Sequence, residues 1–203
     1  MSKRNELKDK ICTIPSRTKY LQEYTSSEIF IAEMEKDNTA YVLSAVDKIR
    51  KTCKIAAIET VLNEEKTFVI TNSPHIVFIP IDGKNGLLKG SSNCDFVFFN
   101  DYDFCFIELK LNATLTINQT LLQQERAIRK NRKKAVEQLK NTISYFDTEL
   151  SENYSGLKLE AYIATPDTYP RENTAFESIK VNFLEKTGID LFESREKRYE
   201  KHQ

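Results

Sequence analysis

The sequence lacks any run of about 18 apolar residues, which is the length that a membrane-spanning helix requires. Its N-terminus, residues 1–10, also lacks the hydrophobic segment of a secretion signal, because it is almost entirely polar. We therefore expect a cytoplasmic protein that has no membrane partner.

Residues that bind zinc or form disulfides are scarce. The chain has two histidines and four cysteines, and no two cysteines form a C-x-x-C pair. Zinc sites and disulfide frameworks are recognised by closely spaced Cys and His residues, so the sequence predicts neither. We expect the cysteines to be buried free thiols. They are Cys12, Cys53, Cys94 and Cys105.

The chain also has no excess of charge of either sign. It has 30 Lys and Arg residues against 30 Asp and Glu residues, so a nucleic-acid partner can be inferred only from local clustering of charge. A length of 203 residues with 40% hydrophobic content fits a single soluble domain. We expect a polar arm over residues 1–37, irregular at first and then forming a short helix that a capping box from Thr25 to Glu28 begins. Residues 38–203 are expected to form the domain.

Residues 94–111 form the most informative stretch, because they read as two apolar strands joined by a tight polar turn. Residues 96–99 and 104–111 are rich in aromatic and β-branched side chains, which favour strands. Residues 100–103 are the kind of short polar link that a hairpin uses.

Three charged residues lie at the ends of these two strands. Side chains alternate between the faces of a strand, so Glu108 and Lys110 share one face and Leu109 points to the other. Burying an unpaired charge costs several kcal/mol. The pattern therefore predicts either a solvent-exposed strand end or a cation site that also uses Asp95.

The order Asp95, twelve residues, then Glu108-Leu109-Lys110 resembles the Asp…(Asp/Glu)-x-Lys signature of the PD-(D/E)XK, or restriction-endonuclease-like, nuclease superfamily. Cys94 stands where that family has its proline. The resemblance implies an α/β fold with a mixed sheet and an αβββαβ core with flanking helices. It also implies a nuclease that depends on Mg²⁺ or Mn²⁺ and acts on nucleic acid, most simply on DNA.

The chemistry of such a site can be derived from the residues. The carboxylates of Asp95 and Glu108 and the backbone carbonyl of Leu109 are hard oxygen ligands suited to Mg²⁺. Lys110 can orient or deprotonate a water molecule and offset negative charge in the transition state. In parts of the family a further acidic ligand comes from the N-terminal region. The sequence leaves three residues open for that role: Asp47, Glu59 and Glu64.

Upstream of the hairpin, the apolar spacing predicts a helix over residues 39–52 that covers one face of the sheet. Residues 54–62 suit the end of that helix or a separate strand, and the strand is favoured. Residues 67–71 and 75–81 are predicted to be strands, and the glycines of residues 82–86 mark a loop.

Downstream, residues 112–120 are predicted to be an extended link that leads to a long helix. The helix has one apolar stripe and starts near Leu121 or Leu122. A strand follows over residues 157–165. We expect a last helix with a capping box from Thr174 to Glu177 and an end at Gly188, then a short segment over residues 189–192 and a frayed helical tail.

Positive charge is concentrated in the early part of the long helix. Six residues spread around a helix cannot share a face, so some of them are expected to be ordinary solvated charges. The six are Arg126, Arg129, Lys130, Arg132, Lys133 and Lys134. Lys130, Lys134 and Gln138 follow one another at four-residue steps and form a polar stripe beside the apolar one. We expect nucleic acid to be bound by Arg126, Arg129, Lys130, Lys133 and Lys134.

Gln138 resembles the polar residue that this helix lends to the active site in the superfamily; the alternative is a glutamine at the boundary of an amphipathic helix. Two other interpretations of the whole chain stay open. One is a catalytically degenerate member of the same fold that only binds nucleic acid or a protein. The other is a β-rich domain in which the spacing of Asp95 and Glu108 is accidental. A homodimer is one possible assembly.

Overall fold

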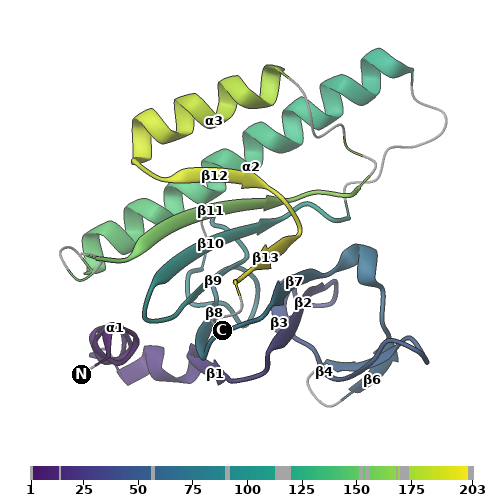
Figure 1. The fold of residues 1–203 in the computed structure, drawn as a ribbon. Coiled ribbons are helices and arrows are strands. Elements are labelled where there is room, and N and C mark those ends of the chain that lie inside the picture. Colours follow the sequence, from purple (N-terminus) through teal and green to yellow (C-terminus); the bar gives the residue numbers. More distant parts are fainter. Residues whose placement is uncertain are drawn as a thin grey trace.

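The structure is a computed structural model that describes residues 2–13, 15–55, 58–89, 92–112, 120–150, 153, 156–167, 169 and 174–200. These residues form a mixed α/β fold with helices on one face of a central sheet and a second sheet on its other face (Figure 1). None of the helices in the described ranges is long and apolar enough to cross a membrane.

The central sheet has six strands in the order β1-β8-β9-β10-β11-β12. The strands β8, β9 and β10 pair antiparallel, whereas β11 is parallel to β10 and β12 is parallel to β11. Every residue of β8, β9 and β10 is buried, which explains why these strands read as continuous apolar runs. The bounds are β1 Gln22–Tyr24, β8 Ile76–Pro80, β9 Phe96–Phe99, β10 Asp103–Leu109, β11 Lys158–Ala164 and β12 Asp190–Glu193.

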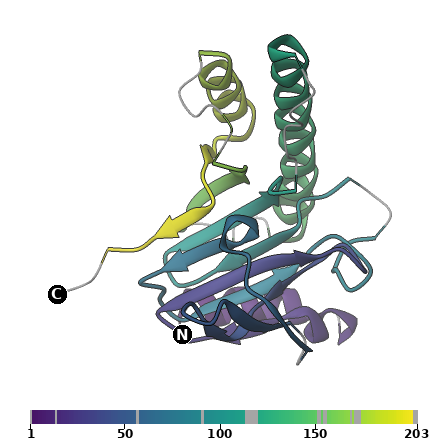
Figure 2. The same cartoon turned by 90° about the vertical axis from the view of Figure 1, so that its right-hand side faces the viewer.

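Three helices pack on one face of this sheet: α1 Lys3–Cys12, α2 Leu121–Leu150 and α3 Thr174–Thr187. Parallel strands need a crossover connection, and α2 supplies it between β10 and β11, whereas α3 supplies it between β11 and β12. Figure 2 shows α2 and α3 side by side on the same face. The apolar stripe of α2 includes Leu139, Ile143 and Phe146, and it packs against the aromatic side chains of β9 and β10.

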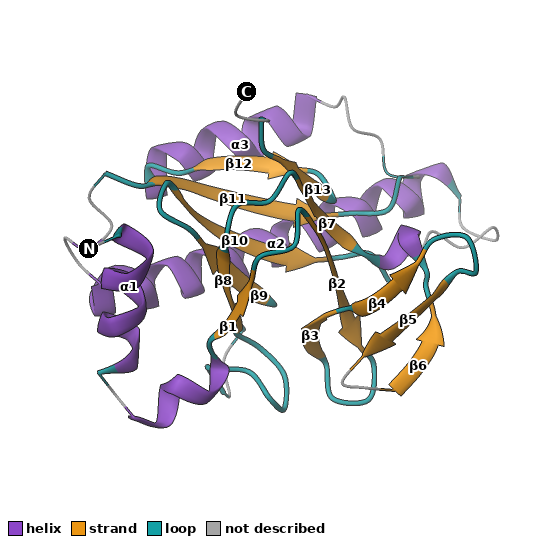
Figure 3. Cartoon of the chain, turned by 60° about the horizontal axis from the view of Figure 1, so that its bottom comes forward, coloured by secondary structure: helices purple, strands orange, loops and turns teal. Residues whose placement is uncertain are grey.

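The other face of the central sheet packs on a four-stranded sheet of order β13-β7-β2-β3. Its strands come from distant parts of the chain: β2 Glu28–Met34, β3 Thr39–Val42, β7 Phe68–Thr71 and β13 Glu196–Arg198. A smaller sheet of β4 Ser44–Asp47, β5 Thr52–Ile55 and β6 Ile58–Val61 lies to one side (Figure 3). Two short 3-10 helices, Pro15–Tyr20 and Glu64–Lys66, complete the described elements.

Several predicted elements are confirmed. The hairpin of β9 and β10 lies where the sequence placed it, and the side chain of Asn100 closes its turn by accepting hydrogen bonds from the backbone N–H groups of Tyr102 and Asp103 at 2.6 and 2.9 Å. The strands β7, β8 and β11 and the helix α2 also agree with prediction. Within residues 54–62, the described residues 54–55 and 58–61 belong to strands and not to a helix. The helix α3 ends as expected at Gly188, whose φ is 69° and whose N–H donates to the Leu184 carbonyl at 2.7 Å.

The prediction of a helix over residues 39–52 is wrong. This stretch forms β3, β4 and a turn, with Ala45 and Lys51 at positive φ angles of 48° and 51°. Ile49, which belonged to the predicted apolar stripe, is 95% exposed. The helical spacing of the apolar residues in this stretch was coincidental. The stretch is instead rich in β-branched residues, which favour strands: Thr39, Val42, Val46 and Thr52.

The predictions for the two ends of the chain are also wrong. Residues 1–37 are not an irregular arm with a helix starting at Thr25, because they contain α1, β1 and β2, and Glu28 is the first residue of a strand. The tail does not form a frayed helix, because residues 196–198 are the strand β13, which pairs parallel with β7. The predicted link over residues 112–120 lies mostly outside the described residues, and so do residues 201–203 and the side chain of Thr174 in the predicted capping box.

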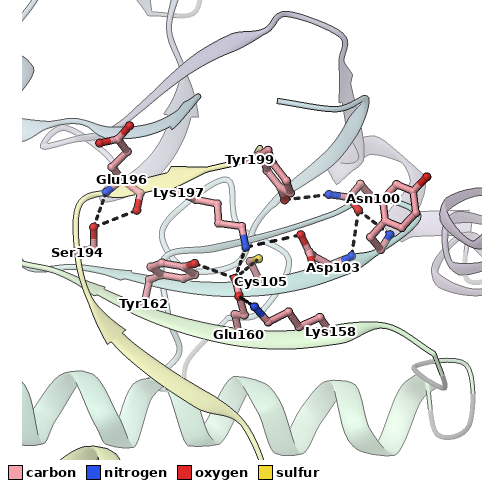
Figure 4. A network of polar contacts seen from close by, with 11 residues as sticks. Asn100, Asp103, Cys105, Lys158, Glu160, Tyr162, Ser194, Glu196, Lys197 and Tyr199 are labelled. Atoms are coloured by element: carbon pink, nitrogen blue, oxygen red, sulfur yellow. Dashed lines mark hydrogen bonds and ion pairs between the residues drawn. The ribbon is translucent and has the colours of Figure 1, made fainter. Parts of the chain in front are cut away.

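A buried polar network fastens β13 to the central sheet (Figure 4). The Lys197 amine binds the carboxylate of Glu160 and lies 3.6 Å from that of Asp103. Tyr162 donates a hydrogen bond to Glu160 at 2.7 Å. Tyr199, two residues after Lys197, accepts a hydrogen bond from the side chain of Asn100 at 2.9 Å. Each carboxylate in this network therefore has a cationic partner.

We predict that Lys197→Ala lowers the free energy of unfolding by roughly 3–5 kcal/mol, because it leaves two buried carboxylates without their shared cation. Lys158→Ala is the matched control, since Lys158 also binds Glu160, at 2.6 Å, but its side chain is 60% exposed. The control should cost no more than about 1 kcal/mol. Urea denaturation of both variants measures the difference, and equal losses would contradict a stabilising role for the buried pair.

Candidate active site

Asp95 lies beside the end of β10. The register of the hairpin pairs Phe96 with Ile107, and the backbone N–H of Asp95 donates to the Ile107 carbonyl at 3.0 Å. The backbone N–H of Leu109 in turn donates to Oδ2 of Asp95. These contacts place the Asp95 carboxylate next to the segment that carries Glu108.

The helix α2 passes the same strand end and contributes Gln138. The Lys110 amine donates hydrogen bonds to Oε1 of Glu108 and to Oε1 of Gln138, the latter at 2.9 Å. Gln138 is itself held, because its Nε2 donates to the Asn93 carbonyl at 2.9 Å. The structure thus brings together Asp95, Glu108, Lys110 and Gln138, with Leu109 packed in the core behind them.

Burial dominates the electrostatics of the two carboxylates. Asp95 is 7% exposed and Glu108 is 1% exposed. Burial raises the pKa of Asp95 to about 7, against the opposing effects of the Leu109 N–H and Lys110. Burial and the neighbouring Asp95 raise the pKa of Glu108 well above its usual range, and Lys110 again opposes the shift. One lysine therefore faces two carboxylates, and a further cation would favour the ionised form of both.

One oxygen of this site has no partner among the described residues. Oε2 of Glu108 is buried and makes no hydrogen bond, whereas Oε1 binds Lys110. A buried acceptor without a partner costs about 1–3 kcal/mol, and more for a charged group. A divalent cation would satisfy this oxygen.

The donor set fits Mg²⁺ better than a metal that needs a closed protein cage. Within the described ranges no group of three or more His, Cys, Asp or Glu side chains lies close enough to hold a metal ion. Mg²⁺ is commonly held by one or two carboxylates and keeps several of its water ligands. Asp95 and Glu108 can supply those two carboxylates, and the carbonyl of Leu109 stays a predicted third ligand.

The three residues left open as a further acidic ligand lie elsewhere. Asp47 is in β4 and Glu59 in β6 of the small sheet, and Glu64 is in a 3-10 helix. None of them is among the largest causes of the pKa shifts of Asp95 and Glu108.

Two acidic neighbours of Asp95 were not predicted from the sequence: Glu33 of β2 and Asp82, which lies two residues after the end of β8. Both raise the pKa of Asp95. The backbone N–H of Asp82 also lies 3.4 Å from the Asp95 carbonyl. Asp82 carried a usable signal, because it lies two residues after the strand that neighbours β9. Glu33 carried none, because its strand was not predicted.

The polar stripe of α2 also anchors the chain that enters the site. Thr142, one turn after Gln138, accepts a hydrogen bond from the Cys94 N–H at 2.9 Å and donates one to the Gln138 carbonyl at 3.2 Å. Gln138 and Thr142 thus hold Asn93 and Cys94, the two residues that precede Asp95. In the segment between β8 and Asp95, residues 90 and 91 lie outside the described ranges.

The six basic residues between positions 126 and 134 of α2 lie in two kinds of environment, buried and exposed. Arg132 is 2% exposed and forms a two-point ion pair with Glu193, with distances of 2.9 and 2.7 Å, and its guanidinium lies over the ring of Phe176. It is therefore part of the packing between α2, α3 and β12. The five residues predicted to bind nucleic acid are all exposed: Arg126, Arg129, Lys130, Lys133 and Lys134.

Comparisons of this chain with protein-family models, with curated proteins and with solved structures found no match. Inferences about its function therefore depend on the residues and their geometry.

We predict that Asp95→Asn makes the protein more stable at about pH 8 but not at about pH 4. The pKa of Asp95 is raised from 3.8 to about 7, so between these values the folded state binds more protons than the unfolded state, and stability falls as the pH rises. At about 1.4 kcal/mol per pKa unit, the effect amounts to roughly 4 kcal/mol. Asparagine keeps an oxygen that can accept from Leu109 and removes the charge.

Urea denaturation across this pH range measures the effect, with Asp9→Asn on the exposed surface of α1 as the control. If Asp95→Asn has the same pH dependence as the wild type, the buried carboxylate does not titrate as described.

Proposed function

We propose that this protein is a Mg²⁺-dependent phosphodiester hydrolase, a nuclease that acts on DNA. The observation that carries the proposal is the buried Glu108, whose Oε2 has no partner among the described residues, beside a second buried carboxylate and a lysine. Fully paired charges would be expected of a purely structural cluster. This cluster has two buried carboxyl groups, one lysine and one unsatisfied oxygen.

The order of the elements supports the proposed αβββαβ core. The strands β8, β9 and β10 form an antiparallel meander, α2 crosses over, and β11 returns parallel to β10. The helix α1 precedes these strands and packs in the same core as α2, so it stands in the place of the first helix. The strands β2 to β7 are then an insertion between α1 and β8.

The side chains have distinct roles in this proposal. Asp95 and Glu108 would hold the ion, and Asp95 is oriented by the Leu109 N–H. When bound, Mg²⁺ would neutralise charge on the scissile phosphate and lower the pKa of a water ligand. Lys110 would steady the attacking water and offset charge in the transition state. Gln138 is a positioning residue, because it binds the Lys110 amine and fixes it relative to Asn93.

We predict that Asp95→Asn, Glu108→Gln and Lys110→Met each reduce Mg²⁺-dependent cleavage by a factor on the order of 10³ or more, since each removes charge at the reacting phosphate. Gln138→Ala should cost about 10–100-fold, as is typical of residues that orient catalytic groups. The assay compares plasmid, linear single-stranded DNA and RNA in Mg²⁺ or Mn²⁺ and with a chelator. Glu59→Gln, exposed on β6, is the control.

Wild-type-like cleavage by any of the first three variants would refute the assignment of the site. If the wild type binds nucleic acid but cleaves none of the substrates in either metal, the protein is instead a degenerate member of this fold that only binds.

We further predict that Lys130 and Lys134, which lie on the exposed side of α2 and lead toward Gln138, contact substrate phosphates. The logarithm of affinity for duplex DNA should fall with the logarithm of salt concentration by about 0.9 per phosphate contact. Lys130→Ala and Lys134→Ala should each make this slope shallower by about that amount. Unchanged slopes in both variants would mean that these lysines are ordinary solvated charges.

A further inference from the structure

A groove with a volume of about 480 Å³ runs between α2 and α3. The two helices lie side by side on the same face of the central sheet in both Figure 1 and Figure 2. The apolar side chains of Val136 and Ile179 line the groove, together with the amide of Asn182. It is a different surface from the candidate active site, with which it shares no lining residue.

The walls of this groove are strongly basic. Four cations line it, namely Arg129, Lys133 and Lys140 from α2 and Lys186 from α3, against the single carboxylate of Glu137. Four positive charges and one negative charge leave a net charge of +3, in a chain whose overall net charge is zero.

The acidic residue does not neutralise the groove. Glu137 pairs with Lys140 at 3.3 Å, and the side chain of Glu137 is 59% exposed. Arg129, Lys133 and Lys186 have no ion pair in the part of the chain that the structure describes. Three exposed cations are thus available to an anionic ligand.

The spacing of the cations favours an extended anion over a small one. Arg129 and Lys140 are eleven residues apart on one helix, which is about 16 Å at a rise of 1.5 Å per residue. A nucleic-acid backbone presents closely repeated charges over such a length, and phosphate oxygens are bound chiefly by Arg and Lys together with neutral donors such as Asn. The apolar lining can accept the faces of sugars.

The position of the groove on α2 relates it to the candidate active site. Gln138 points from this helix to Lys110, whereas the adjacent Glu137 lines the groove. The helix therefore presents one flank to the proposed catalytic residues and the other to α3. Lys130 and Lys134 do not line the groove.

We propose that the groove between α2 and α3 binds the phosphodiester backbone of the substrate, as a second contact region separate from the stripe of Lys130 and Lys134. The identity of the ligand rests on the proposed function. The groove binds a stretch of the backbone that is distant from the scissile phosphate. It contributes to the affinity for the substrate and not to the chemical step.

The test compares Lys133→Gln/Lys186→Gln with the parent protein in a Glu108→Gln background and in a chelator, so that binding is measured without cleavage. Fluorescence anisotropy with a labelled single-stranded oligonucleotide and with its duplex gives the affinity between about 50 and 200 mM salt. The slope of log affinity against log salt should become shallower by about 1.8 for the duplex, or by about 1.4 for the single strand. The form whose slope becomes shallower by its own expected amount is the form that the groove binds.

The matched control is Lys54→Gln/Lys180→Gln, which removes the same charge from β5 and from another part of α3, outside the groove. It should leave the slope unchanged. We call Lys133→Gln/Lys186→Gln the groove pair. The single variant Lys186→Gln should make the slope shallower by about half as much as the groove pair does, and it tests the proposal even if the double variant fails to fold. In cleavage-competent protein, the groove pair should raise KM and leave kcat unchanged.

The outcomes separate the two proposals. If the parent protein binds neither oligonucleotide, the proposed function fails together with this inference. If the parent binds and the groove pair keeps its slope, or if the control pair shows the same loss, the inference alone is overturned. Loss of binding to polyglutamate, with binding to both oligonucleotides retained, would assign the groove to an acidic protein and would also overturn it.

Discussion

The candidate site depends on the contact between Lys110 and the buried Glu108. A carboxylate that is 1% exposed at the end of a strand is tolerated only if a cation or hydrogen-bond donors face it. Lys110 supplies the cation, and its long side chain is fixed in place because Gln138 accepts a second hydrogen bond from the same amine. Lys110 thereby links α2, through Gln138, to Glu108 at the end of β10.

The strand β10 carries a buried acidic residue near each end. The two residues differ in whether the surrounding protein satisfies their carboxyl groups. Asp103 at the start belongs to a network in which Lys197 pairs with the carboxylates of Asp103 and Glu160 and so fastens the last described strand. Glu108 at the other end lies on the opposite face and keeps one oxygen without a partner among the described residues. Ordinary packing explains the first cluster, whereas the second is under-satisfied in the way expected of a site that receives a ligand.

The second half of the fold could be predicted from the sequence because its signals are local. The stripe of α2, the turn at Asn100 and the glycine at the end of α3 each act within a few residues. The four-stranded sheet could not, because β2, β7 and β13 come from three distant segments. No local pattern reveals that these strands pair, although β7 was itself predicted to be a strand. For the same reason Glu33 escaped notice: its proximity to Asp95 exists only once β2 packs against the central sheet.

Cys94 stands where the resemblance led us to expect a proline, and the structure gives a physical reason for a different residue there. The Cys94 backbone N–H donates to Thr142 on α2 at 2.9 Å, and proline has no N–H with which to make this bond. Thr142 lies one turn after Gln138, which holds the preceding carbonyl of Asn93. Two consecutive residues before Asp95 are therefore bound to one face of α2. A proline restricts the backbone through its ring, whereas here α2 restricts the same segment through hydrogen bonds, so the departure from the motif does not loosen the position of Asp95.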